Sequence, residues 1–336
     1  MTYRTVFRSA FAFIVMLLLS ATAHAQLFRS YLAPTGSDAN PCTLPAPCRL
    51  LPAALTAVAD GGEIWMLDSG NYNTGPVNIT KSVTILAVPG ALGSVVAAGG
   101  NAINIATAGV KVALRNLVIV PLLGGGGTGG INMTNGAGLT VENCVIANLT
   151  ATGIYVNTAA SLRVTDTTIR DNGINGIHLL NGARATVTRA TISGNSDTGV
   201  GVFGTVASTT TTADIADSTM DGNNLAFIAW SQNATAILKT SIRDSRVVRN
   251  ITYGLIAQST NGASSTLSVS NNIISNNGDG IRAVSAGSKV WASGNTVSEN
   301  GVGLFNNSGL FESAGNNAVR NNGTNTLGTI TAIATM

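Results

Sequence analysis

Short apolar runs separated by polar residues and glycine recur along the chain at a fixed distance. Val141, Val164 and Val187 lie 23 residues apart, and the isoleucines and glycines that follow them keep the same spacing. Each segment holds three short runs rich in Val, Ile and Thr, none of them long enough for a helix. A fixed period of this length is typical of solenoids whose units stack to bury an apolar face. The pattern predicts an all-β chain, a single-stranded right-handed parallel β-helix with three short strands in each rung.

The limits of this pattern set the expected domain boundaries. We expect the β-helix to cover residues 63–322, with a C-terminal tail over residues 323–336 where the strict spacing is lost. An N-terminal loop and a short capping helix should occupy residues 26–62, because residues 49–59 place Leu51, Leu55 and Val58 on one helical face. Such a helix would cover the apolar surface and the strand edges that the first rung exposes.

The first 25 residues form a predicted signal peptide. Arg4 and Arg8 precede an apolar run that is too short to span a membrane, and Ala23–Ala25 provide an A-x-A cleavage site. Without this segment the chain carries 16 Lys and Arg against 15 Asp and Glu. This near-neutral balance gives no electrostatic reason to expect nucleic acid as a partner. We therefore expect a secreted, periplasmic or cell-surface bacterial protein with no transmembrane segment after cleavage.

Cysteine placement agrees with export. Cys42 and Cys48 flank a proline-rich loop, and in an exported protein we favour a disulfide between them over two free thiols. Cys144 follows a predicted bend beside a core strand, where a small buried thiol is expected. The Cys and His content is too sparse to predict a zinc site.

A column of asparagines recurs three residues after the second apolar run of each rung. We interpret it as a turn ladder, because asparagine tolerates the left-handed conformation of a tight bend and stacked amides can bond between rungs. A polar binding stripe is the alternative. The column comprises Asn172, Asn195, Asn223, Asn250, Asn277, Asn300 and Asn322.

Three consecutive rungs carry longer connections after their third strand, and one earlier rung carries an insertion. We expect loops at Phe203–Ala213, Ser231–Thr240 and Gln258–Thr266, together with the insertion Leu122–Gly130. Long loops on one side of a solenoid commonly mark its binding side.

The N-terminal region contains a series of short motifs at Gly36–Cys42, Pro47–Arg49, Gly61–Ile64, Gly70–Tyr72 and Ile79–Ile85. This series resembles the opening of exported bacterial right-handed β-helix repeat proteins of the pectin-lyase-like superfamily. The resemblance extends from Tyr31 to about Asn322 and implies the same fold. It implies no single function, because that superfamily holds lyases, glycosidases, esterases, epimerases and adhesins.

Superfamily enzymes generally work on the face of the Gly-Ile-x-Val strands, where x points outward. The predicted outward column is Asn132, Tyr155, His178, Gly201, Ala229, Ile256, Arg282 and Phe305. It holds no carboxylate, whereas a glycosidase needs acidic groups to protonate and activate. A calcium-dependent lyase would need clustered carboxylates, and the Asp-Pro-His-Asp-like motif of a mannuronan epimerase is absent from the sequence. We expect no metal or cofactor, with Ca²⁺ relevant only if the protein is a lyase.

A second polar column lies two residues after the first apolar run of each rung. Asp166, Arg189 and Asp217 would stack there either as a solvated charge ladder, which we favour, or as an acidic site. The candidate catalytic residues are therefore His178, Asp217 and Arg189. The candidate ligand-binding residues are Asn132, Tyr155, His178 and Arg282.

The absence of an acidic pair on the outward column favours a glycan-binding or structural surface protein without a recognisable catalytic site. A polysaccharide lyase or glycoside hydrolase with a divergent active site is the alternative. A polysaccharide or cell-surface glycan is the expected partner in both cases. A scaffold without any ligand is the third hypothesis.

Overall fold

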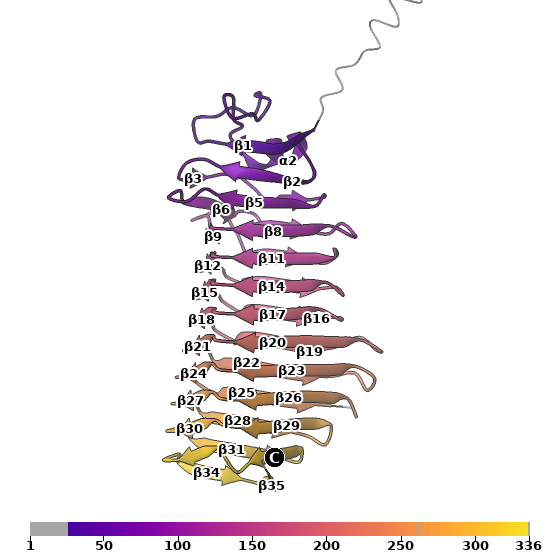
Figure 1. The fold of residues 1–336 in the computed structure, drawn as a ribbon, viewed down its shortest axis with the longest axis vertical. Helices are drawn as coiled ribbons and strands as arrows, with labels where there is room; N and C mark the ends of the chain where they lie inside the picture. The colour runs from indigo at the N-terminus through magenta and orange to yellow at the C-terminus, as the bar shows by residue number, and fades with distance from the viewer. Residues whose placement is uncertain (1–25, 261, 335–336) are drawn as a thin grey trace, which may run out of the picture.

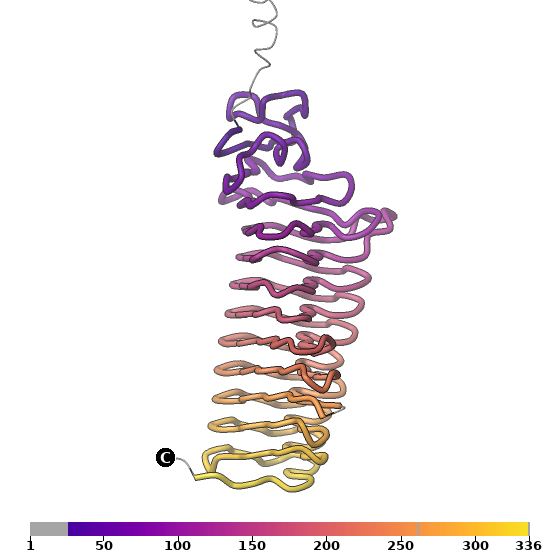
Figure 2. Tube along the Cα trace, turned by 90° about the vertical axis from the view of Figure 1, so that its right-hand side faces the viewer, coloured from indigo at the N-terminus to yellow at the C-terminus, as the bar shows by residue number. Residues whose placement is uncertain are grey.

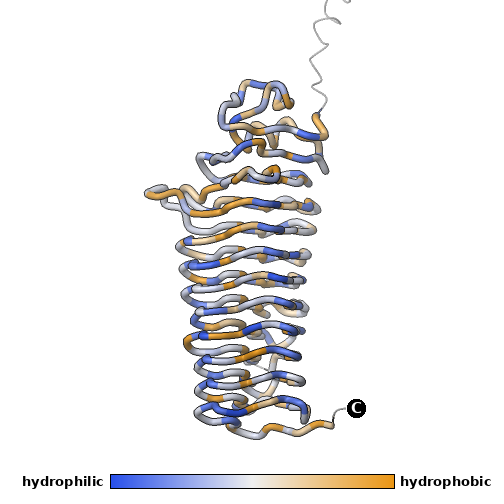
Figure 3. The backbone as a smooth tube through the Cα atoms, turned by 60° about the vertical axis from the view of Figure 1, so that its left-hand side comes forward, coloured by the Kyte–Doolittle hydropathy of each residue, from blue (hydrophilic) through white to orange (hydrophobic). Residues whose placement is uncertain are grey.

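The structure is a computed structural model that describes residues 26–260 and 262–334. The predicted signal peptide therefore lies outside the described residues. The chain winds into a right-handed parallel β-solenoid of three sheets, with successive rungs stacked along one axis (Figures 1 and 2). Apolar and polar segments alternate along every rung, as Figure 3 shows. The predicted fold class is confirmed.

Each rung passes through sheet 1, sheet 2 and sheet 3 in that order. Sheet 1 comprises β1 (Leu27–Leu32), β2 (Val58–Met66), β5 (Val83–Ala87), β8 (Lys111–Arg115), β11 (Gly138–Glu142), β14 (Ser161–Thr165), β17 (Arg184–Thr188), β20 (Thr210–Ala216), β23 (Ile237–Arg243), β26 (Ser264–Ser270), β29 (Ser288–Ser293), β32 (Leu310–Ala314) and β35 (Thr331–Ile333). Sheet 2 comprises β3 (Gly70–Asn71), β6 (Gly93–Ala97), β9 (Leu117–Pro121), β12 (Val145–Ala147), β15 (Thr168–Arg170), β18 (Thr191–Ser193), β21 (Thr219–Asp221), β24 (Arg246–Val248), β27 (Ile273–Ser275), β30 (Thr296–Ser298) and β33 (Ala318–Arg320). Sheet 3 comprises β4 (Val77–Ile79), β7 (Ile103–Ile105), β10 (Ile131–Met133), β13 (Ile154–Asn157), β16 (Asn175–Leu180), β19 (Thr198–Gly204), β22 (Leu225–Ser231), β25 (Tyr253–Ser259), β28 (Asp279–Val284), β31 (Val302–Asn307) and β34 (Thr324–Leu327).

The core follows from the 23-residue period. Val141 pairs in register with Val164, and Val164 pairs with Val187, so equivalent side chains stack in columns inside the solenoid. All three are fully buried. Parallel strands that repeat one apolar position per rung therefore build a continuous core from Val, Ile, Leu and Ala.

The corner between sheets 1 and 2 is a single residue in the left-handed conformation. Its φ lies between 50° and 56° in seven successive rungs. Asparagine and aspartate adopt this conformation more readily than other residues with a side chain, which explains most of the column. Its members are Asn116, Asn143, Asp166, Arg189, Asp217, Asp244 and Asn271.

The asparagine ladder lies at the corner between sheets 2 and 3, and its amides bond between rungs as predicted. The predicted left-handed conformation of the asparagines is wrong. The left-handed bend there is made by the residue before each asparagine, for example Asp171 before Asn172. The asparagines themselves point inward, where Asn195 Nδ2 donates to Asn223 Oδ1 at 2.8 Å and Asn223 Nδ2 donates to Asn250 Oδ1 at 3.1 Å. The column is asparagine because a buried corner needs a side chain that both donates and accepts.

A second internal ladder, which the sequence analysis missed, follows the corner between sheets 1 and 2. Side chains of Ser218, Ser245 and Asn272 each accept a backbone N–H from the preceding rung. Cys144 occupies this column, with Sγ 3.2 Å from the Glu142 carbonyl oxygen. Burial raises the pKa of the Cys144 thiol to about 11. The thiol therefore stays protonated and serves as a weak bonding group of the corner.

The N-terminal end differs from its prediction in two ways. Helix α2 (Leu51–Ala57) is present, but Val58 begins β2 instead of continuing the helical face. The segment 26–62 also contains β1, which pairs with β2 and extends sheet 1 by one strand. A disulfide joins Cys42 and Cys48 in the loop between β1 and α2.

The predicted tail and the predicted long loops also need correction. Strands β34 and β35 lie inside the segment 323–336, so sheets 1 and 3 continue beyond the expected boundary. In the three rungs with longer connections, the extra residues lengthen the strands to seven residues each. Short turns project beyond the starts of β20 and β23, at the right of Figure 1. In the described part of the chain, no helix is long and apolar enough to cross a membrane.

Candidate functional site

Sheet 3 carries the predicted outward column, with one error of register. Asn132, Tyr155 and His178 pair in consecutive rungs, and His178 pairs with Gly201. In the next rung Gly201 pairs with Ile228, whereas Ala229 is fully buried inside. The register differs because β22 carries Phe227 at the inward position that valine or isoleucine occupies in earlier rungs.

Aromatic rings on sheet 3 pack against one another. The centroid of His178 lies 5.3 Å from that of Tyr155 and 4.5 Å from that of Phe203, with which it is stacked. The Phe203 ring lies over Gly201, where an added Cβ would be 2.4 Å from the ring. Trp230 continues the row at 6.5 Å from Phe203. The structure thus brings the candidates Tyr155 and His178 together, but their ring faces are turned toward neighbouring rings.

His178 has no acidic neighbour in this row. Its Nδ1 lies 2.7 Å from the Asn175 side-chain nitrogen, so the histidine is paired with an amide. Burial lowers the pKa of His178 to about 4. The imidazole is therefore neutral at physiological pH, and among the described residues no carboxylate bonds to it to orient it as a general base.

Arg282 lies four strands away from His178 on the same sheet and is largely buried. Its guanidinium donates to Asp279 Oδ2 at 3.0 Å and lies between the rings of Tyr253 and Phe305, at 4.9 and 4.4 Å from their centroids. Asp279 and Arg282 therefore form an ion pair on the face where the sequence predicted the ligand-binding residues. However, the pair is enclosed by aromatic rings, which is the arrangement of a structural ion pair.

The remaining catalytic candidates lie at the corner between sheets 1 and 2, away from His178. Arg189 donates to both carboxylate oxygens of Asp166 at 2.7 and 2.8 Å, and this contact lowers the pKa of Asp166. Asp217 forms no ion pair with Arg189 within the described residues. The expected three-member charge ladder is therefore one exposed pair plus Asp217, and the three catalytic candidates do not converge on one site.

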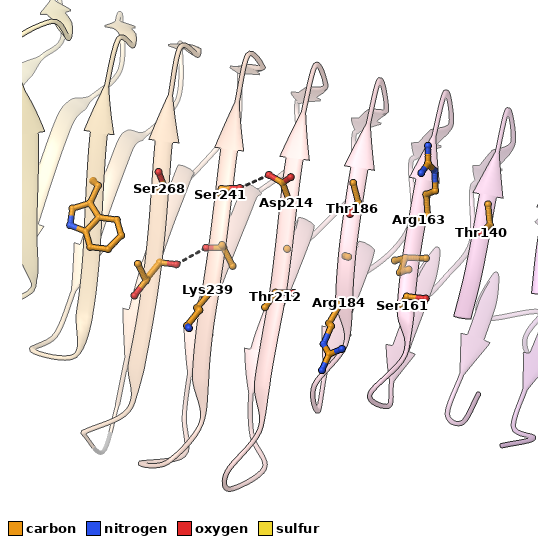
Figure 4. A pocket seen from close by; sticks show the side chains of 16 residues that line it. Thr140, Ser161, Arg163, Arg184, Thr186, Thr212, Asp214, Lys239, Ser241 and Ser268 are labelled. Atoms are coloured by element: carbon orange, nitrogen blue, oxygen red, sulfur yellow. Dashed lines mark hydrogen bonds between the residues drawn. The ribbon is translucent and has the colours of Figure 1, made fainter. Parts of the chain in front are cut away.

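A groove lies elsewhere, on the outer face of sheet 1 (Figure 4). It encloses about 900 Å³ and crosses the strands from β11 to β29. Alternate residues of each strand point into it, and most carry hydroxyl groups. These hydroxyl residues are Thr140, Ser161, Thr186, Thr212, Ser241, Thr266 and Ser268.

Three cations dominate the charge of this groove. Arg163, Arg184 and Lys239 are exposed, and within the described residues none of them forms an ion pair. Asp214 is the groove's carboxylate, and it accepts a hydrogen bond from the Ser241 hydroxyl. Trp291 lies at one end with 43% of its surface exposed. The groove therefore combines hydroxyls, net positive charge and an aromatic surface.

Sequence reasoning missed this groove because it followed the Gly-Ile-x-Val strands of sheet 3. The available signal was the alternation within the sheet 1 strands, where Arg184, Lys239 and Trp291 occupy outward positions.

Among the residues that the structure describes, no three His, Cys, Asp or Glu side chains are grouped as metal ligands.

Comparison with known sequences agrees with this architecture. The sequence model for the family described as "Right handed beta helix region" matches residues 94–216. The match covers part of the chain and agrees with the right-handed β-helix that the structure shows there. No curated protein is significantly similar to it in sequence.

Solved structures show the same fold at low sequence identity. The A-module of mannuronan C-5 epimerase AlgE4 from Azotobacter vinelandii is 13% identical, with a TM-score of 0.59 over 82% of this β-helix protein and 87% of that chain. Pectate lyase Pel9A is 17% identical, with a TM-score of 0.57 over 88% and 79% of the two chains. The Dettilon tailspike protein is 14% identical, with a TM-score of 0.51 over 90% and 68%. These likenesses show the same right-handed β-helix fold, and the proteins that share it here have different functions.

Proposed function

We propose that this β-helix protein binds a polysaccharide along the groove of sheet 1 without cleaving it. The observation that carries the proposal is the groove itself, an open channel lined by hydroxyls and by cations without ion pairs. The strands from β11 to β29 are spaced by roughly 5 Å each, so the groove is roughly 30 Å long and suits an extended polymer. Hydroxyl, guanidinium and indole groups are those that bind sugar hydroxyls and rings.

The groove contains one acidic residue, which is too few for glycoside hydrolysis. Hydrolysis needs two carboxyl groups on opposite sides of the bond that is cleaved. Asp214 is a single carboxylate, and its bond to Ser241 uses one of its oxygens. A Ca²⁺ ion needs six to eight oxygen ligands that usually include several carboxylates, and this donor set does not fit it. A lyase or hydrolase with a divergent site remains the rival function because structural neighbours include an epimerase and a lyase that act on polysaccharides.

We also propose that the protein works outside the bacterial cytoplasm. The predicted signal peptide over Met1–Ala25 and the disulfide between Cys42 and Cys48 support this location, because disulfides persist in oxidising compartments.

A polysaccharide panel with purified residues 26–336 tests the proposal. Each polymer is scored both for retention of the protein and for new reducing or unsaturated ends. We expect retention without products, and weaker retention for the double variant R184A/K239A. Products that are lost in the variants H178A or D217A would show an enzyme whose catalytic residues are those predicted from the sequence. Products that are lost only in D214A would show an enzyme whose active site is the groove of sheet 1. If no polymer of a broad panel retains the protein or yields products, the proposal fails and the protein is a scaffold without a glycan ligand.

A further inference from the structure

One column of outward residues along the groove alternates between cations and threonines. Arg184 pairs with Thr212, Thr212 pairs with Lys239, Lys239 pairs with Thr266, and Thr266 pairs with Lys289. Positive charge therefore recurs on every second rung over five successive strands of sheet 1. Figure 4 shows Arg184, Thr212 and Lys239 in line on neighbouring strands.

The three cations of this column are free to meet a ligand. Each is exposed, and none forms an ion pair with any described carboxylate. By contrast, Arg29, Arg115 and Arg243 on the same sheet each contact an acidic residue. Charges that lack an internal partner and recur in register are better explained by an external partner than by the stability of the fold.

The rung between Arg184 and Lys239 carries the opposite charge. Asp214 lies on β20 two residues after Thr212, so it points to the same face of the sheet and lines the same groove. A ligand anion at this rung would meet a carboxylate and a neutral hydroxyl, whereas an anion one rung away would meet a cation. Arg163 lines the groove on β14, one rung before Arg184, so the alternation begins at β17. From β17 to β29 the groove favours one charge spacing and opposes the shorter one.

We infer that this column binds an acidic polysaccharide that carries one anionic group per disaccharide and lies along the solenoid axis. The inference rests on the proposed function and adds the ligand's charge pattern to it. Two rungs span roughly 9.5 Å, and a sugar unit in an extended chain is about as long as one rung is high. Alternate sugars then place their anions at Arg184, Lys239 and Lys289, while neutral sugars lie at Thr212 and Thr266.

Three soluble polymers with different charge patterns test the inference. Hyaluronan carries one carboxylate per disaccharide, polygalacturonate carries one per sugar, and dextran carries none. Binding of residues 26–336 is measured by calorimetry at low and at physiological salt. We expect hyaluronan to bind best per disaccharide, polygalacturonate to bind less well, and dextran to bind least, with salt weakening the first two.

Variants separate charge from spacing. R184A/K239A should weaken hyaluronan binding about tenfold, because each exposed ion pair contributes up to about 1 kcal/mol. R246A is the matched control. Arg246 is an exposed cation on the outer face of sheet 2, and it forms no ion pair with a described residue. The variant R246A should leave hyaluronan binding unchanged. D214N removes the opposing charge with little change of shape and should raise polygalacturonate affinity more than hyaluronan affinity, by about threefold. Circular dichroism confirms that each variant is folded.

Each outcome decides the inference. Equal binding of dextran and hyaluronan without salt dependence would overturn it but leave the proposed function intact. Polygalacturonate binding better than hyaluronan, with D214N affecting both equally, would overturn the spacing. If none of the three polymers binds, the inference fails, and retention of some other polysaccharide in the wider panel decides whether the proposed function survives. A sulfated polymer with one sulfate per disaccharide that binds like hyaluronan would support the same charge pattern for a different anion.

Discussion

Replacing Asn223 by alanine should strongly destabilise the middle of the solenoid. Asn223 is fully buried, and its Oδ1 accepts the backbone N–H of Asn195 at 3.0 Å and the Nδ2 of Asn195 at 2.8 Å. Its own Nδ2 donates to the Ile192 carbonyl oxygen at 3.1 Å and to Asn250 Oδ1. One side chain therefore connects three rungs.

The expected cost follows from the groups that the alanine leaves without a partner. Two N–H groups of Asn195 lose their acceptor in a site that excludes bulk water. An unsatisfied buried polar group costs about 1–3 kcal/mol, so we expect N223A to lower the free energy of unfolding by about 4 kcal/mol. The matched control is N322A at the C-terminal end of the same ladder, where the asparagine is only partly buried. Water can replace its bonds there, and we expect a loss of about 1 kcal/mol.

Two measurements check this prediction. Guanidinium unfolding followed by far-ultraviolet circular dichroism gives the change in stability, although a solenoid need not unfold in one step. Hydrogen exchange then locates the effect, because the amide of Asn195 should lose its protection while amides near the C-terminal end keep theirs. Equal losses for N223A and N322A, or full protection of the Asn195 amide in N223A, would refute the argument that the buried amide stack stabilises the fold.

Two further predictions concern the aromatic row of sheet 3. Because burial lowers the folded-state pKa of His178 to about 4 while the unfolded chain binds a proton near 6.5, stability should be full above pH 6.5 and fall by roughly 3 kcal/mol as pH drops to about 4. Unfolding measured against pH should show this slope in the native chain and not in H178Q. In G201A the new methyl group should displace the Phe203 ring from His178 at a cost of about 1 kcal/mol. The pKa of His178, followed by NMR, should then rise toward 6.5, and an unchanged pKa would show that the Phe203 ring does not desolvate the imidazole.

The sequence predicted the rungs well because their signal is repeated. Val141, Val164 and Val187 are each weak evidence for a strand, but their common spacing leaves few folds that bury all of them. β1 was missed because Leu27–Leu32 lies outside this spacing and pairs with β2 only after an intervening loop and helix. The C-terminal strands were missed for the same reason, since β34 and β35 are short, exposed and irregularly spaced.

The groove was harder to predict because no single segment contains it. Arg184 and Lys239 are 55 positions apart in the sequence, and each alone is an ordinary solvated residue on a strand. Their alignment depends on the lengthened strands β20 and β23, whose extra residues were interpreted as loops. A one-residue shift, like the one that moved Ala229 inside, would have placed Lys239 in the core.

The asparagine ladder also has a direction, which sets how this chain can be shortened or extended. Every amide nitrogen donates toward the next rung and every amide oxygen accepts from the previous one, so all the side-chain dipoles point the same way. Such a series needs a terminal acceptor, and Asn325 supplies it by placing Oδ1 3.1 Å from Asn322 Nδ2. Whole 23-residue rungs could therefore be excised from the interior between equivalent bends. A chain cut just before Asn325 would instead leave Asn322 Nδ2 with only the backbone carbonyl oxygens of Val297 and Arg320 as acceptors.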